Sequence, residues 1–308
     1  MKTEHSSFGI IPIFKKGNDI FVCCVLNKKS DEWGLPKGTP EEGKSPIETV
    51  KRELQEETGI TEFKIIGGKT FLENYSFEED RITHQKQNVY YIAEVTNMIE
   101  KNSAIDSVDM KWINIKEADG FFKFETLKKV LKEVLSYMNK FPLTNKYKGR
   151  SGETYLFEYY ESDSVEHLPS EQLSQVVVMA FHNGKLLIVN NSTKPGTYGP
   201  VCGSIEKGER PEDCLARELK EESNMKILDF KLIGYQKCTN LSNSEKSDEY
   251  QLRYFAKVEP IGPFTPDCDP DGDVTELLEI DPVGYKKYFD WGVTGDEIMK
   301  RALFFLKS

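Results

Sequence analysis

The sequence is poor in positive charge, and this limits its partners. It carries 41 Lys and Arg against 51 Asp and Glu, for a formal net charge of −10. An acidic chain is repelled by polyanions such as DNA or an anionic membrane surface, and no basic helix-turn-helix segment is evident. We therefore expect neither a nucleic acid polymer nor a membrane as partner. A small phosphorylated molecule, whose charge a bound cation can screen, remains compatible.

Cysteine and histidine are scarce and form no motif. The six cysteines include no CxxC pair, and no signal peptide or long apolar run precedes them. This usage is typical of free thiols in a reducing compartment, so we expect a cytoplasmic protein whose thiols lie partly in the core. The four histidines share no spacing, and no role is assigned to them.

What the sequence does contain is a long-range repeat of charged residues. GTPEEGKSPIETVKRELQEETGI (38–60) recurs as GSIEKGERPEDCLARELKEESNM (203–225), at a constant offset of 165 residues. Packing alone would preserve apolar positions, so a charged repeat indicates a duplicated functional unit. The charged pairs are Arg52 and Arg217, Glu53 and Glu218, Glu56 and Glu221, and Glu57 and Glu222.

Local signals place the charged residues of the first copy on a helix. Ser45 is a good N-cap, Pro46 suits the first helical position, and Glu48 completes a capping box. Gly59 supplies the left-handed residue that ends a helix. The sequence therefore predicts a helix of about three turns between Ser45 and Gly59.

The predicted helix has an apolar face and a carboxylate face. Glu53, Glu56 and Glu57 lie at positions i, i+3 and i+4 and therefore cluster. Clustered carboxylates repel one another unless a cation lies among them, and hard oxygen ligands suit Mg²⁺ or Mn²⁺. A solvated helix face would be the ordinary meaning of a single glutamate run, but the second copy argues against it. The predicted metal ligands are Glu53, Glu56, Glu57, Glu218, Glu221 and Glu222.

Both copies resemble the Nudix box, G-x5-E-x7-R-E-U-x-E-E-x-G-U, in which U is aliphatic. The second copy has Glu209 at the first glutamate position, whereas the first copy has Lys44 there. A cation beside the carboxylates is expected to weaken metal binding, which makes the second copy the better candidate for full activity. Asn224 replaces the terminal glycine of the box, and asparagine tolerates the left-handed conformation.

The resemblance implies an α/β (α+β) chain of two tandem Nudix domains, each an αβα sandwich with a mixed sheet between helices. The predicted boundaries are an N-terminal domain at 1–140, a polar linker at 141–152 and a C-terminal domain at 153–308. Segments 8–14 and 20–26 read as paired strands, and segments 175–181 and 186–191 as their counterparts. Segments 126–138 and 296–306 read as the closing helix of each half.

Three residues beside the boxes are candidates for substrate binding. Trp33 and its counterpart Tyr198 could stack on a base, or could equally cover the edge of a sheet. Lys37 lies just before the first box, where it could meet a phosphate or remain an exposed lysine. The sequence leaves these alternatives open.

A carboxylate outside each box is a candidate ligand or general base. The resemblance implies such a residue before a late strand, and Asp106 and Asp271 stand there at the 165-residue offset. A loop aspartate at a turn is the alternative. The run DCDPDGDVTE also resembles the start of a calcium loop, but its twelfth position is Leu278 instead of glutamate.

From the resemblance we expect a Mg²⁺- or Mn²⁺-dependent pyrophosphohydrolase acting on nucleoside or dinucleoside polyphosphates, including oxidised nucleoside triphosphates. Arg52 and Arg217 stand four residues before Glu56 and Glu221, so they are expected to orient these ligands. Two alternatives remain: a non-catalytic half that binds nucleotides as a regulatory module, or an ADP-sugar substrate. The sequence leaves the oligomeric state open.

Overall fold

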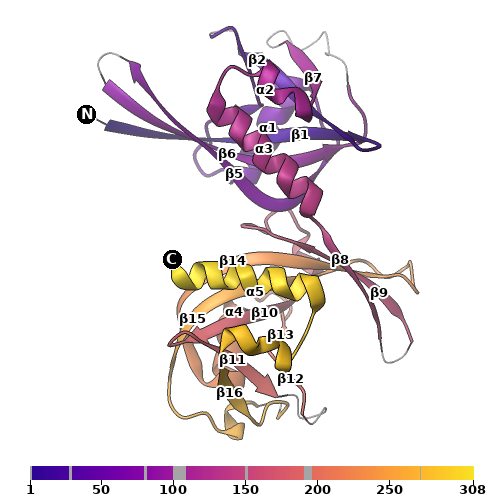
Figure 1. Cartoon of the computed structure of the whole chain (residues 1–308), viewed down its shortest axis with the longest axis vertical. Coiled ribbons are helices and arrows are strands. Elements are labelled where there is room, and N and C mark those ends of the chain that lie inside the picture. Colours follow the sequence, from indigo (N-terminus) through magenta and orange to yellow (C-terminus); the bar gives the residue numbers. More distant parts are fainter. Residues whose placement is uncertain are drawn as a thin grey trace. The chain divides into compact units, whose positions relative to one another are not determined.

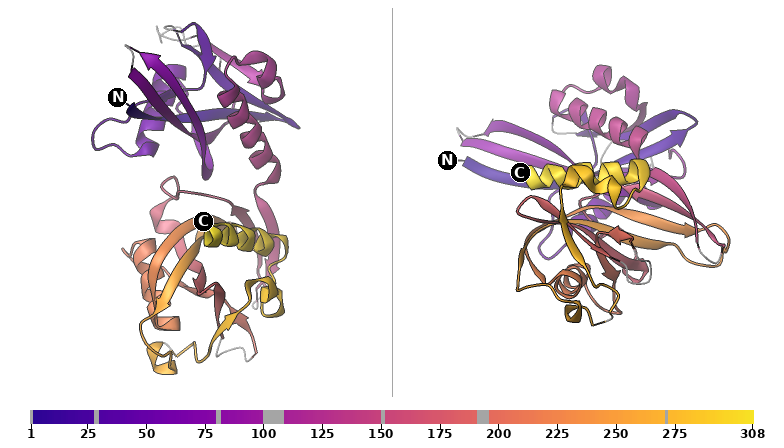
Figure 2. Two further views of the ribbon diagram at one scale, coloured as in Figure 1. Left: turned by 60° about the vertical axis from the view of Figure 1, so that its left-hand side comes forward. Right: turned by 60° about the horizontal axis from the view of Figure 1, so that its bottom comes forward.

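The chain forms two compact units, Met1–Phe141 and Pro142–Ser308. This computed structural model describes residues 2–27, 30–79, 82–99, 109–149, 152–190, 196–270 and 272–308. Each unit contains one mixed sheet packed with helices, which confirms the predicted fold class (Figures 1 and 2).

The first unit is built on a sheet of seven strands in the order β3-β2-β1-β6-β5, with β4 paired to β1 and β7 paired to β2. Only β1 and β6 run parallel among these pairs. Its elements are β1 (Lys2–Lys16), β2 (Asp19–Asn27), β3 (Glu32–Gly34), β4 (Lys37–Gly38), α1 (Pro46–Thr58), β5 (Phe63–Glu79), β6 (Ile82–Val95), β7 (Met110–Asn114), the 3-10 turn Ile115–Glu117, α2 (Ala118–Phe121) and α3 (Glu125–Lys140).

Helix α1 begins and ends where its sequence predicts. The Ser45 hydroxyl accepts from the Glu48 backbone N–H at 3.2 Å, and the Glu48 carboxylate accepts from the Ser45 N–H at 2.9 Å. Gly59 ends the helix at φ 76°, in the left-handed region. The apolar face, with Val50 and Leu54, packs on the sheet together with Tyr91 of β6.

The opposite face of the first sheet meets α3. Thr126 of α3 donates to Glu73 of β5, which also accepts from Tyr90 of β6. Because side chains alternate along a strand, Tyr90 and Tyr91 point to opposite faces of the sheet. The carboxylate helix and the closing helix therefore cover different faces.

The second unit repeats this plan with two added strands. Its sheet has the order β12-β11-β10-β15-β14-β9-β8, with β13 paired to β10 and β16 paired to β11. Its elements are β8 (Leu143–Lys148), β9 (Thr154–Tyr160), the 3-10 turn Ser170–Gln172, β10 (Leu173–His182), β11 (Lys185–Asn190), β12 (Tyr198–Gly199), β13 (Val201–Ser204), α4 (Pro211–Ser223), β14 (Met225–Asn240), β15 (Glu249–Pro260), the 3-10 turn Pro266–Cys268, β16 (Leu277–Ile280), the 3-10 turn Pro282–Lys287 and α5 (Gly292–Lys307).

Part of the segment predicted as a linker, 141–152, belongs to the second sheet. Residues 143–148 form β8, which pairs antiparallel with β9 from Leu143↔Tyr159 to Lys148↔Thr154. The polar composition that suggested a linker is that of an exposed edge strand, because most side chains of β8 face solvent. The second unit therefore begins ahead of the predicted residue 153.

Helix α4 ends as predicted at Asn224, which has φ 52° and ψ 38°. Its backbone N–H donates to the Lys220 carbonyl at 2.9 Å, and its side-chain amide donates to the Pro263 carbonyl at 2.9 Å. Asparagine thus substitutes for glycine at this position and adds a contact to the loop beyond β15.

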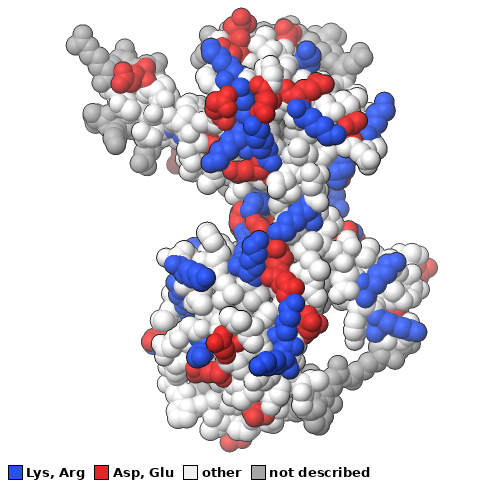
Figure 3. All heavy atoms as spheres, in the orientation of Figure 1, with Lys and Arg blue, Asp and Glu red and all other residues white. Residues whose placement is uncertain are grey.

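The cysteines are free, and Cys23, Cys24 and Cys214 are buried in the cores as expected. Within the described ranges, no helix combines the length and apolarity that crossing a membrane would require. On the face seen in Figure 3, acidic and basic side chains are interspersed over each unit.

Candidate active site

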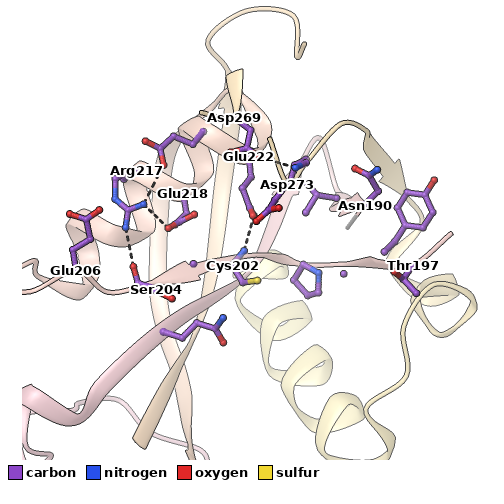
Figure 4. A pocket seen from close by; sticks show the side chains of 18 residues that line it. Asn190, Thr197, Cys202, Ser204, Glu206, Arg217, Glu218, Glu222, Asp269 and Asp273 are labelled. Atoms are coloured by element: carbon purple, nitrogen blue, oxygen red, sulfur yellow. Dashed lines mark hydrogen bonds and ion pairs between the residues drawn. The ribbon is translucent and has the colours of Figure 1, made fainter. Parts of the chain in front are cut away.

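The carboxylates of α4 line a cavity of about 560 Å³ in the second unit (Figure 4). One wall is the helix face with Glu218, Glu221 and Glu222. Another is formed by β13 and the residues before it, and the loop ahead of β16 closes a third side. The helix geometry that places the carboxylates on one face thus directs them into a concave surface, where a ligand can reach them.

Glu222 is fixed by the strand that precedes the box. Its Oε2 accepts from the Cys202 backbone N–H at 3.0 Å. Burial raises the pKa of Glu222 to about 8, and the negative charges of Glu218, Asp269 and Asp273 raise it further, against the opposing Cys202 hydrogen bond. A carboxylate in this setting gains from any cation that approaches it.

Arg217 holds the other carboxylates of the box. Its guanidinium forms a bidentate pair with Glu209, at 2.9 and 3.0 Å. Nη1 also contacts Glu218 at 2.6 Å and Glu221 at 3.2 Å, and Nη2 donates to the Ser204 carbonyl. The hydrogen bonds from Arg217 hold the pKa of Glu209 below its usual value. Because every described contact of Arg217 is internal, its role here is to position the carboxylates.

The box glycines allow the helix to approach the strand closely. A Cβ added to Gly203 would lie 1.8 Å from the Glu218 carboxylate, and one added to Gly38 would lie 1.8 Å from the Glu53 carboxylate. Separations this short are sterically forbidden, so only glycine admits the carboxylate at either position.

The first unit repeats this arrangement. Glu57 accepts from the Lys37 backbone N–H at 3.1 Å, and burial raises its pKa to about 7. Arg52 contacts Glu53 at 2.6 Å and Glu56 at 2.8 Å. Burial also raises the pKa of Glu53, although the Arg52 charge opposes this shift.

The structure corrects the expectation for Lys44. Its Nζ pairs with Glu48, in the first turn of α1, at 3.2 Å, and both side chains are about half exposed. The place of the missing box glutamate is taken by Glu41, which contacts Arg52 Nε at 3.4 Å. The sequence motif could not reveal Glu41, because this residue stands three positions before the one that the motif specifies.

The predicted substrate-binding residues lie beside the carboxylates or at the sheet edge. Tyr198 lines the second cavity, and its hydroxyl donates to Glu276 at 2.6 Å. The Trp33 ring packs against Phe121, with 5.5 Å between ring centroids. The backbone of Lys37 holds Glu57, as described above.

Asp106 and Asp271 lie outside the described residues. Two neighbouring carboxylates that the sequence did not single out, Asp269 and Asp273, line the second cavity. Asp269 accepts from the Val274 N–H at 2.7 Å and so fixes its own loop. Figure 4 shows Asp273 beside Glu222.

Sheet register supplies the signal that would have found Asp273. Val25 pairs with Gly34 and Met110, whereas Val189 pairs with Gly199 and Leu277, so Met110 and Leu277 occupy equivalent positions. In the sequence Asp106 stands four residues before Met110, and Asp273 stands four residues before Leu277. By strand register, therefore, Asp273 is the counterpart of Asp106, and the offset of 165 does not extend this far.

The chemistry of the donor set fits Mg²⁺ or Mn²⁺. Hard carboxylate oxygens face one cavity, and the raised pKa of Glu222 reports their mutual repulsion. Within the described part of the chain, however, no three such side chains form a preassembled metal cage. Glu218 and Glu221 turn toward Arg217 and Glu222 toward Cys202. They would have to turn from these partners to share one ion.

Comparison with known proteins finds the same family in both units. The NUDIX domain model matches residues 3–138 and 172–292. The asymmetrical bis(5'-nucleosyl)-tetraphosphatase of Sus scrofa is 32% identical over 104 residues, which cover 33% of this chain and 68% of that protein. The NAD-capped RNA hydrolase NudC of Pseudomonas syringae pv. tomato is 32% identical over 78 residues, which cover 25% of this chain and 28% of that protein. A solved Ap4A hydrolase binary complex from C. elegans is 18% identical and covers 44% of this chain and 99% of its own, with a TM-score of 0.38.

Proposed function

The chain belongs to the NUDIX domain family, and from this premise we propose that it cleaves nucleoside or dinucleoside polyphosphates, including oxidised nucleoside triphosphates, with the help of Mg²⁺ or Mn²⁺. That it is a Nudix hydrolase acting on phosphoanhydrides follows from the family and from its hydrolase relatives. The similarity to a bis(5'-nucleosyl)-tetraphosphatase supports nucleotides as the substrate class.

The observation that carries the proposal is the convergence of carboxylates on one cavity in the second unit. Glu218, Glu221 and Glu222 would hold the cation there, as Glu53, Glu56 and Glu57 would in the first unit. When bound, the cation neutralises charge on the phosphate oxygens and lowers the pKa of an attacking water.

The remaining residues have supporting roles in this proposal. Arg217 orients Glu218 and Glu221, and Cys202 orients Glu222 through its backbone N–H. Asp273 faces the same cavity and is a candidate to accept the proton of the water, together with Asp106 and Asp271. Tyr198 is positioned at the cavity wall to contact the nucleoside, and Trp33 and Lys37 hold the corresponding places in the first unit.

A substrate panel with controlled metal tests this proposal. Purified full-length protein should release phosphate, pyrophosphate or a nucleotide from at least one nucleoside or dinucleoside polyphosphate when Mg²⁺ or Mn²⁺ is added. Excess chelator should stop the release, and added Mg²⁺ should restore it. Hydrolysis that continues in chelator would refute the metal-dependent mechanism.

Two alternatives keep an observable basis. The Arg52–Glu41 contact of 3.4 Å is longer than the bidentate Arg217–Glu209 contacts, which favours the second unit for catalysis and a nucleotide-binding role for the first. ADP-sugars belong in the same panel, since they also contain a phosphoanhydride. Hydrolysis confined to ADP-sugars would replace the proposed substrate class.

A further inference from the structure

A buried arginine without a carboxylate partner lies on the α5 face of the second sheet. Arg253 of β15 is 4% exposed. Its Nη2 donates to the side-chain oxygens of Gln236 and Gln251, while its Nε is buried without a hydrogen-bond partner. Burial lowers the pKa of Arg253 to about 10. A buried cation with an unused donor is costly unless something compensates it.

The arginine lines a recess of about 380 Å³, called here the Arg253 recess. Its walls combine flat apolar rings with amides, and the Arg253 guanidinium lies 5.9 Å from the Trp291 ring centre. The wall residues used below are Phe157, Gln175, Gln236, Gln251, Arg253 and Trp291. Such a mixture of aromatic surface and a few polar groups is typical of a site for a flat, polar ligand.

The Arg253 recess adjoins the carboxylate cavity. Gln175, Gly199, Pro200 and Cys202 line both. Cys202 also holds Glu222 through its backbone N–H, so the two sites are separated by the thickness of one strand. A single extended ligand can therefore reach from the carboxylates into the recess.

The first unit carries opposite chemistry at the equivalent positions. Val177 pairs with Cys202 and Arg253, and Gly9 pairs with Lys37 and Tyr90, so Tyr90 is the counterpart of Arg253. The same registers make Gln251 the counterpart of Asn88, and Gln236 the counterpart of Glu73. An acidic and phenolic set in the first unit thus corresponds to a cationic set in the second.

In the first unit these side chains satisfy one another. The Glu73 carboxylate accepts from Asn88 at 2.8 Å, from Tyr90 at 3.1 Å and from Thr126 of α3 at 2.8 Å. In the second unit the corresponding glutamines leave the Arg253 Nε unused. This asymmetry points to a ligand that supplies acceptors to the second unit alone.

We propose that the Arg253 recess binds the base of the nucleotide substrate and selects a guanine-type base by its two acceptor atoms. Guanine presents O6 and N7 as adjacent acceptors, which an arginine can contact together. Adenine presents a donor, the N6 amino group, in place of O6, and that donor would face the cation. The rings of Trp291 and Phe157 provide surface for the flat base. The inference rests on the proposed function for the identity of the ligand as a nucleotide.

Binding of analogues that cannot be hydrolysed tests the inference separately from catalysis. The α,β-methylene diphosphates of guanosine and adenosine contain no phosphoanhydride and differ only in the base. With Mg²⁺ and full-length protein, calorimetry should give a Kd about tenfold lower for the guanosine analogue, as a bidentate base contact predicts. Equal or tighter binding of the adenosine analogue would overturn the inference.

Two variants assign the preference to Arg253. Arg253→Met should bring the two dissociation constants within about twofold of each other, mainly by weakening the guanosine analogue. Arg253→Lys keeps the charge but loses the planar fork, so it should also lose most of the preference. Thermal melting checks folding, and Arg253→Met should not lower Tm, because it removes a buried unpaired charge. A preference that survives both folded variants would show that another residue reads the base.

A control variant in the first unit and a competition assay complete the test. Tyr90→Phe alters the equivalent position in the first unit and should leave the preference unchanged. Inorganic pyrophosphate should compete equally in wild type and Arg253→Met, whereas competition that depends on Arg253 would make the recess a phosphate site and overturn the inference. If the guanosine analogue binds as expected but no nucleotide is hydrolysed, the proposed function fails while the base preference stands.

Discussion

Glu57 and Glu222 occupy the same place in the two units, and their surroundings differ in degree. Each accepts a backbone N–H from the strand before its box. Burial raises the pKa of Glu57 to about 7 and that of Glu222 to about 8. Nearby charge differs as well: Lys37 lies near Glu57, whereas Asp269 and Asp273 lie near Glu222. The second unit thus concentrates more negative charge at the site.

This difference predicts unequal effects of neutralising each carboxylate. Glu222→Gln keeps size and helix propensity but removes a ligand charge, and we expect it to lower kcat/KM on the order of 100-fold. Glu57→Gln should cost less. Both variants are measured on the same substrate with metal in excess, and melting curves confirm that each is folded. The opposite order would identify the first unit as the main catalytic unit.

Lys44 is predicted to have no influence on metal binding, since it pairs with the exposed Glu48. Lys44→Glu should change the metal concentration for half-maximal activity by less than about twofold, because exposed pairs contribute little. The titration is made in a Glu222→Gln background, so that the second unit does not mask the first.

The matched contrast to Lys44→Glu is Glu41→Gln, which weakens the contact that holds Arg52. It should raise the metal requirement in the same background. A lower requirement in Lys44→Glu would show that the lysine charge does reach the carboxylates.

At the scale of elements, the approach of α4 to β13 depends on Gly203. An alanine Cβ there would overlap the Glu218 carboxylate, so Gly203→Ala must displace either the side chain or the helix. We expect a loss of about 1–3 kcal/mol in stability, as for other overpacked sites, together with loss of activity from the second unit. Chemical denaturation and kinetic assays measure the two effects.

Gly284 provides the control for this substitution. A Cβ added there meets no atom within 4 Å, so Gly284→Ala should change neither stability nor activity appreciably. If Gly203→Ala behaved like this control, the close packing of Glu218 would not matter for function.

Elements with local signals were predictable from the sequence. The Ser45 capping box, the left-handed Gly59 and Asn224, and the closing helices all follow from short-range patterns, and the structure confirms them. The contribution of Glu41 and the role of Arg253 were not predictable. Each depends on which residues a strand register or a turn brings together, and the sequence carries no local mark of this.

The equal-offset argument failed for a related reason. The boxes recur at 165 residues, but Tyr90 and Arg253, which are equivalent in the sheet, stand 163 residues apart in the sequence. Insertions and deletions in the loops, and irregular register in β5 and β14, change the offset along the chain. Asp273 could therefore be recognised only after the strands were aligned.

At the scale of the whole molecule, the division between units predicts how the chain can be cut. The second unit includes β8, which pairs with β9 and contacts α5. A fragment of residues 142–308 should therefore fold cooperatively. A fragment of residues 153–308 loses β8, exposes the edge of β9 and should associate more readily. Because β8 is largely exposed, we expect a loss of about 1–2 kcal/mol, or roughly 2–8 °C in Tm.

Thermal melting and light scattering of the two fragments measure this difference. The Arg253 recess offers a second readout, because Tyr147 of β8 lies in its wall. The shorter fragment should therefore also bind the guanosine analogue less tightly, while its carboxylate cavity, which β8 does not line, stays intact. Equal melting temperatures and equal affinities would mean that residues 142–152 act only as a connection. Failure of both fragments to fold would show instead that each unit depends on the other.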